Sequence, residues 1–412
     1  MAGTVLSLLA LAIGYAAPSL RPLRSSHYGV MIGTKECNVA DYGAKGDGNA
    51  DDTNALQRAI NDCGAGGGGV VRIPSKTQAV PNGGARFLSF ALVINASNLE
   101  LNLESGATLL INDNRGKWND HCHNCDFISA SGVQHIAVTG EGTIDGQGKN
   151  WWKHRDDFRP HTIQFSGVTM ALIESITIID PPNHCMEIFA DHAELSHVSV
   201  QAPPSTGTSN PSHNTDAVDV HGSPFFIHDC HFDTGDDNVA VHSSNVLVEN
   251  CKFGNGHGAS IGSLCDAQLS NITFRGIDFQ GTTNGARIKV REGCSGHVSD
   301  VTYQDLTMDG VENPIDISMH YDSLAGTIQQ SSGFLLERVT FKNITSKNSK
   351  YAGNFFCTKQ SPCKDIALQS VDLGTSDWTC RSPKVHTNDA CDCFSETSGH
   401  TKDVKPSPCL RS

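Results

Sequence analysis

Four short polar strings between residues 214 and 289 contain side chains that could do acid–base chemistry. They are Asn214-Thr215-Asp216, Gly235-Asp236-Asp237-Asn238, Gly256-His257-Gly258 and Arg287-Ile288-Lys289. Asp216, Asp237 and His257 follow one another at steps of about 20 residues, which is within the range of repeating folds. A chain that repeats its structure at this interval would bring the three side chains into one column.

Three carboxylates, an imidazole and two cations suit the hydrolysis of a glycosidic bond. One carboxylic acid protonates the leaving oxygen while another carboxylate takes a proton from the attacking water. Because neighbouring carboxylates cannot all ionise freely, the last to ionise has a raised pKa and remains protonated as the acid. We expect His257 to hydrogen-bond this acid. Arg287 and Lys289 alternate along the chain, so both would face one side and bind a substrate carboxylate.

Each of these residues also has an ordinary structural interpretation. Asp and Asn satisfy the backbone at turns, so a single Asp here would be a turn former. Asp219, which has no polar string of its own, keeps that interpretation. His257 between two glycines could be a corner residue, and Arg287 with Lys289 could form a solvated basic face. The catalytic interpretation depends on complementary groups that occur together at matching intervals.

A short apolar pattern recurs along the chain and predicts the elements that position these strings. In each unit two residues separate the first apolar position from the second, and one residue separates the second from the third. The last two apolar positions alternate as on a strand and therefore share one face. The units are Val133/Ile136/Val138, Ile173/Ile176/Ile178, Leu195/Val198/Val200, Ile227/Cys230/Phe232, Val248/Cys251/Phe253, Leu269/Ile272/Phe274, Val298/Val301/Tyr303, Leu336/Val339/Phe341 and Leu368/Val371/Leu373.

The step from Ile227 to Val248 is equal to the step from Val248 to Leu269. A constant step of about 20 residues, with Gly, Asn or Asp between the strands, is typical of a solenoid of parallel β coils. Such coils lie about 4.8 Å apart. The longer step from Leu195 to Ile227 then contains a loop inserted at a corner, residues 203–211. An antiparallel sandwich is the alternative, but the matching side-chain pattern favours the solenoid.

The two ends of a solenoid must be covered so that open strand edges do not pair with other chains. Residues 51–62 have the best amphipathic helix pattern and precede the coils, so we expect a short N-terminal capping helix there. The coils should form one catalytic domain over residues 37–377, after an N-terminal segment at 17–36. The Cys-rich tail, residues 378–412, shows no further repeat and is expected to cover the other end.

The first 16 residues are typical of a secretory signal peptide. An apolar run from Val5 to Ile13 precedes a site that suits cleavage after Ala16. No other stretch approaches the roughly 20 apolar residues of a membrane helix. We therefore expect a soluble, extracellular protein in which many of the 15 cysteines form disulfides. Glycosylation sequons occur at Asn95, Asn271 and Asn343.

The sequence predicts no metal site and no cofactor. Cys122-His-Asn-Cys125 and Cys391-Asp-Cys393 lack the second ligand pair that a zinc site requires. The formal net charge of -14 argues against nucleic acids and anionic membranes as partners. An anionic polysaccharide would need a local basic pocket to overcome this charge, which makes the two cations of the fourth string important.

The four strings, in this order, resemble the signature of the polygalacturonase family of glycoside hydrolases, family 28. The resemblance extends over most of the chain, through residues 38–48 and 140–148 to Asn313-Pro-Ile and Tyr321. It implies an all-β, single-stranded right-handed parallel β-helix. It also implies hydrolysis of α-1,4-linked galacturonic acid in pectin with inversion of configuration.

The resemblance implies a role for each matching residue. The matches are Asp236 as the general acid, Asp216 and Asp237 as the pair that activates water, His257 as a supporting histidine, Arg287 and Lys289 as cations for galacturonate carboxylates, and Tyr321 and Asn183 as contacts of the substrate. One position departs from the pattern. Asn238 follows the paired acids where many fungal and plant members have Cys, so a disulfide from this position must be missing.

Several related functions remain alternatives. An exo-acting polygalacturonase, or a hydrolase of xylogalacturonan or rhamnogalacturonan, would share the fold, although Arg287 and Lys289 favour galacturonate at the cleaved bond. Pectate lyases share the coil but use Ca²⁺, and a non-catalytic β-helix could only bind polysaccharide. The chain has no large extra domain of the kind found on some exo-acting relatives, so we expect endo action, by a monomer.

Overall fold

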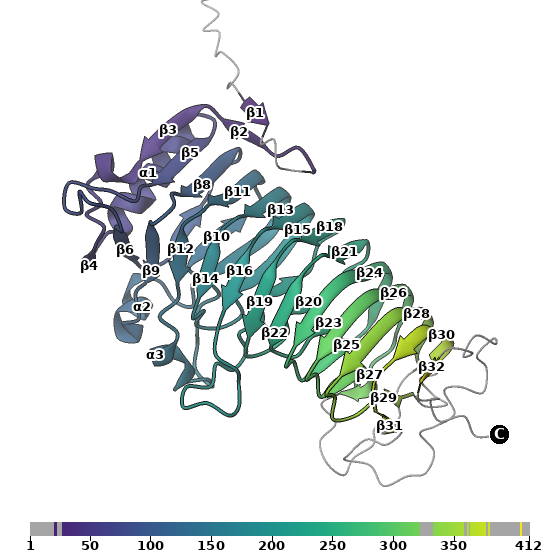
Figure 1. The fold of residues 1–412 in the computed structure, drawn as a ribbon. Helices are drawn as coiled ribbons and strands as arrows, with labels where there is room; N and C mark the ends of the chain where they lie inside the picture. The colour runs from purple at the N-terminus through teal and green to yellow at the C-terminus, as the bar shows by residue number, and fades with distance from the viewer. Residues whose placement is uncertain are drawn as a thin grey trace, which may run out of the picture.

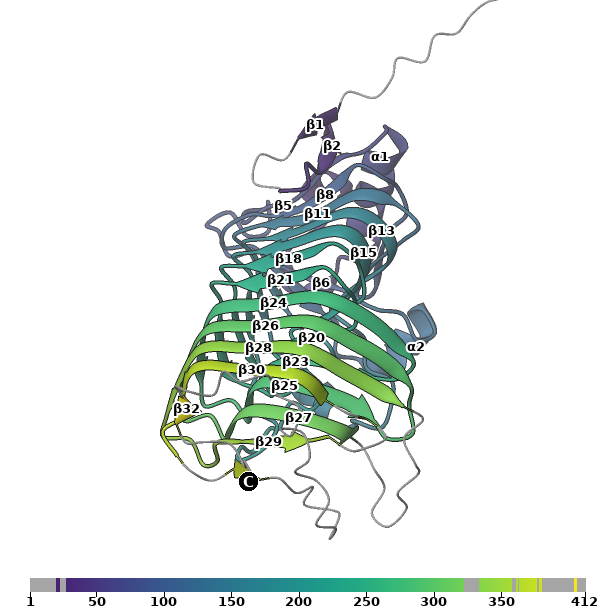
Figure 2. The same cartoon turned by 90° about the vertical axis from the view of Figure 1, so that its right-hand side faces the viewer.

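The chain forms a long parallel β-helix (Figure 1). The computed structural model describes residues 20–22, 27–321, 333–357, 361, 363–375, 378–379 and 404–405. Within these described ranges, thirty strands join one sheet, and the pairings within it are parallel. Figure 2 shows the coils stacked along one axis, with β24, β26, β28 and β30 following one another. The predicted all-β parallel β-helix is confirmed.

Each coil contributes strands to three faces. The first face contains β3 (Lys35–Asn38), β5 (Gly69–Ile73), β8 (Leu99–Leu103), β11 (Gln134–Gly140), β18 (Phe225–His228) and β21 (Val246–Glu249). The second contains β4 (Asp47–Asp51), β6 (Arg86–Ser89), β9 (Thr108–Ile111), β12 (Thr143–Asp145), β14 (Thr177–Ile179), β16 (Ser199–Gln201), β19 (His231–Thr234) and β22 (Lys252–Asn255). The third contains β7 (Leu92–Ile94), β10 (Ile128–Ser131), β17 (Val218–Val220), β20 (Val239–Val241), β23 (Ala259–Leu264), β25 (Asn284–Arg291), β27 (Asn313–Tyr321), β29 (Gly353–Phe356) and β31 (Trp378–Thr379).

Longer strands bend around a corner and serve two faces. In β13 (Ile163–Glu174) and β15 (Met186–Ser196), the first residues lie on the third face and the rest on the first. In β24 (Ala267–Gln280), β26 (Gly296–Asp309), β28 (Phe334–Lys347) and β30 (Cys363–Asp372), the strand runs from the first face to the second. Two short elements complete the set: β1 (Leu20–Pro22) pairs antiparallel with β2 (Met31–Gly33), and β32 (Val404–Lys405) pairs with β30.

The interior of the helix is filled by stacked apolar side chains, as the repeat predicts. The Tyr303 ring stacks on Phe274 at 4.9 Å and on Phe341 at 5.4 Å between centroids. All three are buried. The Tyr303 hydroxyl donates to the carbonyl of Arg287 at 3.0 Å, so it ties the core column to a strand of the third face.

The register implied by the repeating units is wrong at several steps, where the first residue of one unit pairs with the last residue of the unit before it, as Ile173 does with Val138 and Leu368 with Phe341. The equal step from Val248 to Leu269 is also wrong. Val248 pairs with Phe274 and not with Leu269, so this step is longer than the one before it. The strand β24 carries two overlapping apolar units, starting at Leu269 and at Phe274, and both satisfy the pattern. Only pairing with β21 decides between them, because periodicity within one strand does not fix register with the next.

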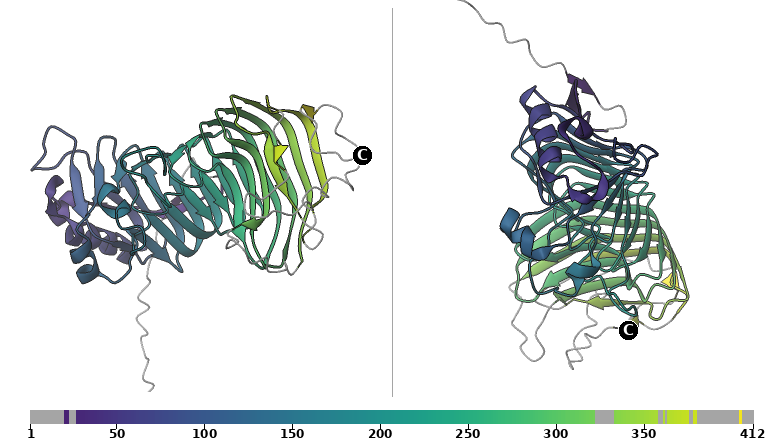
Figure 3. Two further views of the ribbon diagram at one scale, coloured as in Figure 1. Left: turned by 90° about the horizontal axis from the view of Figure 1, so that it is seen from below. Right: turned by 90° about the vertical axis from the view of Figure 1, so that its left-hand side faces the viewer.

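The N-terminal end is capped as predicted. The helix α1 (Thr53–Ala65) lies across η1 (Val39–Tyr42), β3 and β5 at that end of the coils (Figure 3). The apolar face that it buries includes Leu56 and Ile60. A disulfide joins Cys37 of β3 to Cys63 of α1. The cap therefore covers the edge of the first coil and is fixed to it covalently.

At the other end, β31 and β32 add two-residue strands to the coils. The rest of the tail, and the expected signal at residues 1–16, lie outside the described residues. The prediction that the tail covers the end therefore stays untested.

Cysteines of the described residues form disulfides, as the sequence predicts. Cys122 pairs with Cys125, Cys265 with Cys294 and Cys357 with Cys363. The other short motif, residues 391–393, lies outside the described part of the chain.

The helices that the structure describes include none long and apolar enough to cross a membrane. Two further short helices, α2 (Arg115–His121) and α3 (Lys149–Trp152), follow coils near the N-terminal end.

Candidate functional site

The third face positions the predicted residues in register. Strand pairing aligns the positions that precede these strands on successive coils. Met186 pairs with Val218 and Val239 with Ala259, and the N–H of Ala217 donates to the carbonyl of Asp237. The resulting turn column consists of His184, Asp216, Asp237 and His257. The regular steps between the polar strings therefore do bring Asp216, Asp237 and His257 together, as the spacing predicted.

Asp237 is held by two cations of β25, two coils along the helix axis. Its side chain is 1% exposed and contacts Lys289 Nζ, while Arg287 Nη1 lies 3.4 Å from its Oδ1. Ser260 of β23 donates to the same oxygen at 2.8 Å. Both cations of the Arg287-Ile288-Lys289 string face this carboxylate, which confirms that their alternation along β25 points them to one side.

Asp236 is more accessible than its neighbour. Its side chain is 23% exposed, and its Oδ1 lies 2.8 Å from His257 Nδ1. The backbone N–H of Asp237 donates to the same oxygen at 3.0 Å. The expected hydrogen bond between His257 and one acid of the cluster is therefore present, and that acid is Asp236.

His184 connects Asp216 to a second buried acid. His184 Nε2 lies 3.6 Å from Asp216 Oδ1, and its Nδ1 lies 3.1 Å from Asp219 Oδ2. Asp219 is a buried residue of β17, so its interpretation as a turn former is wrong. His242 Nε2, on the next coil, lies 3.8 Å from Asp219 Oδ1.

The spacing of the sequence also indicates His184 as a member of the turn column. The interval from His184 to Asp216 equals the interval from Leu195 to Ile227 across the inserted loop. Applying the step of the apolar units to the polar strings would have added His184 to the column.

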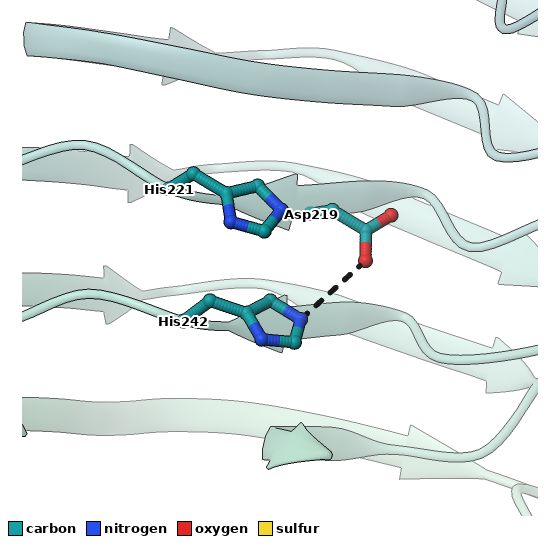
Figure 4. A group of neighbouring side chains, drawn as sticks. All are labelled: Asp219, His221 and His242. Atoms are coloured by element: carbon teal, nitrogen blue, oxygen red, sulfur yellow. Dashed lines mark ion pairs between the residues drawn. The ribbon is translucent and has the colours of Figure 1, made fainter. Parts of the chain in front are cut away.

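A stack of rings lies beside the acids. Phe189, His221 and His242 occupy equivalent positions on three coils, and their centroids are separated by 4.0 and 4.6 Å. Figure 4 shows His221 and His242 one above the other next to Asp219. The alternation that points the Asp219 side chain away from the core points the two histidines to the same side.

Tyr321 and Asn183 lie at opposite ends of the site. The Tyr321 ring contacts both cations, with Arg287 Cζ 5.2 Å and Lys289 Nζ 5.1 Å from its centroid. Asn183 donates to the Arg159 carbonyl at 3.3 Å. Arg159, which sequence reasoning missed, donates to Asn214 Oδ1 at 2.9 Å and so fixes the turn before Asp216.

Asn238 has a clear structural role in place of a cysteine. Its buried side-chain amide donates to the carbonyls of Phe232 and Gly254, and its Oδ1 accepts from the N–H of Gly258 at 2.9 Å. These bonds connect the turn of the paired acids to the turn of His257. At this position, therefore, hydrogen bonds and not a disulfide connect neighbouring coils.

Comparison with known proteins identifies the family. The model of "Glycosyl hydrolases family 28" matches residues 80–391, and that of "Rhamnogalacturonase A/epimerase, pectate lyase-like" matches residues 37–80. The chain belongs to glycosyl hydrolases family 28.

The relatives of this chain in family 28 include polygalacturonases. The chain is 30% identical over 361 residues to a probable polygalacturonase of Arabidopsis thaliana, which covers 84% of this chain and 75% of the relative. It is 31% identical over 358 residues to a polygalacturonase of Cryptomeria japonica, covering 82% and 66%. The solved polygalacturonase of Erwinia carotovora superposes with a TM-score of 0.70 at 25% identity, covering 81% and 93%. This family 28 chain is a polygalacturonase-like glycoside hydrolase.

The surroundings of the acids separate their pKa values. Burial, and then the charge of Asp236, raise the pKa of Asp216 well above its usual range. Burial also opposes ionisation of Asp236, but the hydrogen bond and charge of His257 outweigh it and lower the pKa of Asp236. The sequence predicts one carboxyl group with a raised pKa, and in the absence of substrate that carboxyl group is Asp216.

The neighbouring cations are stabilised by the same acids. Burial disfavours a charge on His184, but Asp216 and Asp219 raise its pKa to about 10. Burial likewise disfavours a charge on Lys289, and Asp237 raises its pKa above the usual value. In this family 28 member, the buried acids of the site are therefore paired with His184, Arg287 and Lys289. These cations offset the acids locally, although the chain as a whole carries a net charge of -14.

Proposed function

We propose that this chain is a secreted polygalacturonase that hydrolyses α-1,4-galacturonosyl linkages inside the polymer with inversion of configuration. The observation that carries the proposal is the arrangement around the paired acids. Asp236 is accessible and bonded to His257, while Asp237 beside it is buried and held by Lys289 and Arg287. Two adjacent carboxyl groups with such different surroundings are suited to different roles in one reaction.

The contacts and exposure of the three carboxyl groups support a different catalytic role for Asp236 than for Asp216 and Asp237. Asp237 is buried and paired with two cations, an arrangement that suits a base and not a proton donor. Asp236 is the most exposed of the three carboxyl groups and can reach a leaving oxygen. We therefore assign Asp236 as general acid and Asp216 with Asp237 as the pair that activates water.

Substrate binding would move the proton of the cluster. In the free chain burial raises the pKa of Asp216, whereas His257 lowers that of Asp236. A bound galacturonate would expel water from Asp236 and place a negative charge near it, and both effects raise a carboxyl pKa. Asp236 would then take up the proton that it must donate, leaving Asp216 ionised to activate water.

Arg287 and Lys289 support a uronate as the bound sugar. They are 11% and 6% exposed and lie against the Tyr321 ring. Their interactions with Asp237 hold them in place before substrate arrives, so little conformational entropy would be lost when they bind a carboxylate.

Replacing Arg287 with Gln should raise KM for polygalacturonate more than tenfold, because a charged hydrogen bond worth about 1.5 to 3 kcal/mol would be lost.

The central experiment replaces Asp236 with Asn. Reducing-sugar release from polygalacturonic acid should fall by a factor of about 100 to 10,000, the usual contribution of a general acid. Asp278→Asn, which removes one carboxylate from an exposed position of β24, is the matched control and should keep full activity. Full activity in Asp236→Asn would exclude the proposed mechanism.

Three further measurements test the finer parts of the proposal. Oligomers among the early products would support internal cleavage, and galacturonic acid alone would exclude it. Proton NMR of the first product should show the β anomer, as inversion of an α linkage requires. Four disulfides between described residues support an oxidising compartment, and signal cleavage after Ala16 can be checked by sequencing the mature N-terminus.

A further inference from the structure

Two histidines and an aspartate that have no role in the proposed reaction converge beside the site (Figure 4). Asp219 lies in β17, and His221 and His242 directly follow β17 and β20. One ligand atom from each lies within 4.8 Å of the other two. In Figure 4 a ring nitrogen of each histidine points toward the Asp219 carboxylate.

The three side chains are held in this arrangement by their neighbours. The His221 ring lies between Phe189 and His242, with interplanar angles of 9° and 8°, so this stack sets the plane of the ring and allows movement within that plane. His184 lies 3.1 Å from Oδ2 of Asp219, while Oδ1 faces His242 at 3.8 Å. A histidine outside the group thus orients the carboxylate, which is how outer residues commonly orient metal ligands.

The donor set selects a class of ion. Two imidazole nitrogens and one carboxylate oxygen suit Zn²⁺, whereas Ca²⁺ and Mg²⁺ require six or more oxygen ligands. Tetrahedral Zn²⁺ with bonds of about 2.1 Å keeps its ligand atoms about 3.4 Å apart. His242 and Asp219 are 3.8 Å apart, and no pair of the three atoms is more than 4.8 Å apart, so the required approach is at most about 1.4 Å. Rotation of the Asp219 carboxylate and movement of the two rings within their planes can supply it.

We propose that Asp219, His221 and His242 form a Zn²⁺ site whose fourth position is filled by water. The site lies on the third face, next to the carboxylates of the reaction. The proposal concerns binding of the ion and does not depend on which polysaccharide the enzyme cleaves.

The test is calorimetric titration of the full chain with ZnCl₂ at pH 7 after removal of metals with EDTA. We expect one ion per chain and a rise in Tm with Zn²⁺, with no heat from CaCl₂. His221→Gln and His242→Gln should each weaken binding by at least about tenfold. His297→Gln is the matched control, because His297 is a partly exposed histidine that pairs with Glu337 outside this group.

Two results would overturn the proposal. One is the lack of stoichiometric binding by the wild-type chain. The other is unchanged affinity in both histidine variants, which would place the ion elsewhere, as in the group of Asp236, Asp237 and His257. Co²⁺ provides a measurement that needs no variant: strong visible absorption indicates the low coordination number proposed, and the weak absorption of an octahedral ion contradicts it.

Discussion

At the scale of single residues, the three carboxylates lie close together but have different contacts. Asp237 contacts two cations, Asp236 contacts His257, and Asp216 lies near His184 without a hydrogen bond to its Oδ1 from any described residue. A buried carboxyl with so few partners keeps its proton more readily than one that accepts charged hydrogen bonds. The differences in pKa follow from these contacts.

The proposed transfer of the proton predicts a difference between two pH profiles. The profile of kcat/KM reports the free enzyme, and that of kcat reports the substrate complex. If substrate raises the pKa of Asp236, activity on the basic side should be lost at a higher pH in kcat than in kcat/KM. The values belong to the coupled cluster as a whole. Basic limbs that coincide would show that substrate leaves the proton where it is.

His184 should stabilise the fold in a pH-dependent manner. Its pKa is raised from about 6.5 in the unfolded chain to about 10 by Asp216 and Asp219, against the effect of burial. The stabilisation is therefore complete below about pH 6.5 and is lost as the pH rises through 10. His184→Gln should lower the free energy of unfolding by about 1 to 3 kcal/mol at pH 6 and by much less at pH 10.

Urea unfolding in EDTA buffer at the two pH values measures this difference. His231→Gln is the control, because His231 is 52% exposed and pairs with Asp233 at the surface. It should change stability little at either pH. An equal loss for His184→Gln at pH 6 and pH 10 would mean that the side chain acts through packing and not through its charge.

The sequence predicted the residues that stand in recognisable strings and missed those that do not. Asp216, Asp236 and His257 were found because each is flanked by Gly, Asn or Thr in a polar string. Asp219 was misassigned because it lies between two valines of a buried strand and its histidine partners come from other coils. Contacts across coils are invisible in a linear sequence unless the step between coils is known.

At the scale of elements, the turn that presents His257 depends on the glycine that follows it. Gly258 has φ 89°, and a Cβ added there would lie 2.1 Å from the carbonyl oxygen of Asn284 on the next coil. Any side chain would therefore move one coil relative to the other. The Gly-His-Gly string is a requirement of the backbone as well as of the chemistry.

Gly258→Ala should destabilise the chain by about 2 to 4 kcal/mol and strongly reduce activity, because His257 would move with the turn. Gly281→Ala is a matched control: its φ is 68°, but no atom lies within 4 Å of the added Cβ. That change should cost only about 1 to 2 kcal/mol and leave kcat unchanged. Equal effects of the two substitutions would rule out the close contact as the cause.

The register of the strands was less predictable than their existence. The apolar pattern identified most coils, but β24 contains two overlapping units and its register was assigned wrongly. Arg287 and Lys289 were nevertheless placed on the correct face. Alternation within a strand fixes the side on which a residue lies, whatever its partner on the next strand.

At the scale of the whole molecule, each coil contacts mainly its neighbours. Stability in such solenoids is approximately a sum of coil and interface terms, so damage at one end stays local. The N-terminal cap is the clearest case, because α1 packs on η1, β3, β5 and β7 of the first coils and a disulfide holds it there. The amphipathic pattern predicted this helix to within a few residues.

Replacing Cys37 and Cys63 with Ala should therefore loosen the cap without stopping the reaction. A disulfide that closes a loop of 26 residues contributes about 3 kcal/mol. Hydrogen exchange should become faster in α1, β3 and β5 and stay unchanged in β20 and β23, with normal kcat at 25 °C. The corresponding replacement of Cys265 and Cys294 is the contrast, because it should affect strands beside the site. Uniformly faster exchange in the first variant would contradict local stability.

The loop at residues 203–211 has a consequence for how such enzymes diversify. It lengthens one corner between β16 and β17, yet Met186 still pairs with Val218 and Val200 with Phe232 on either side of it. Insertions at this corner therefore leave the alignment of His184 with Asp216 intact. Evolution can change the length and composition of the chain around the substrate while inheriting the reacting groups unaltered, and a protein engineer could exchange the loop for the same reason.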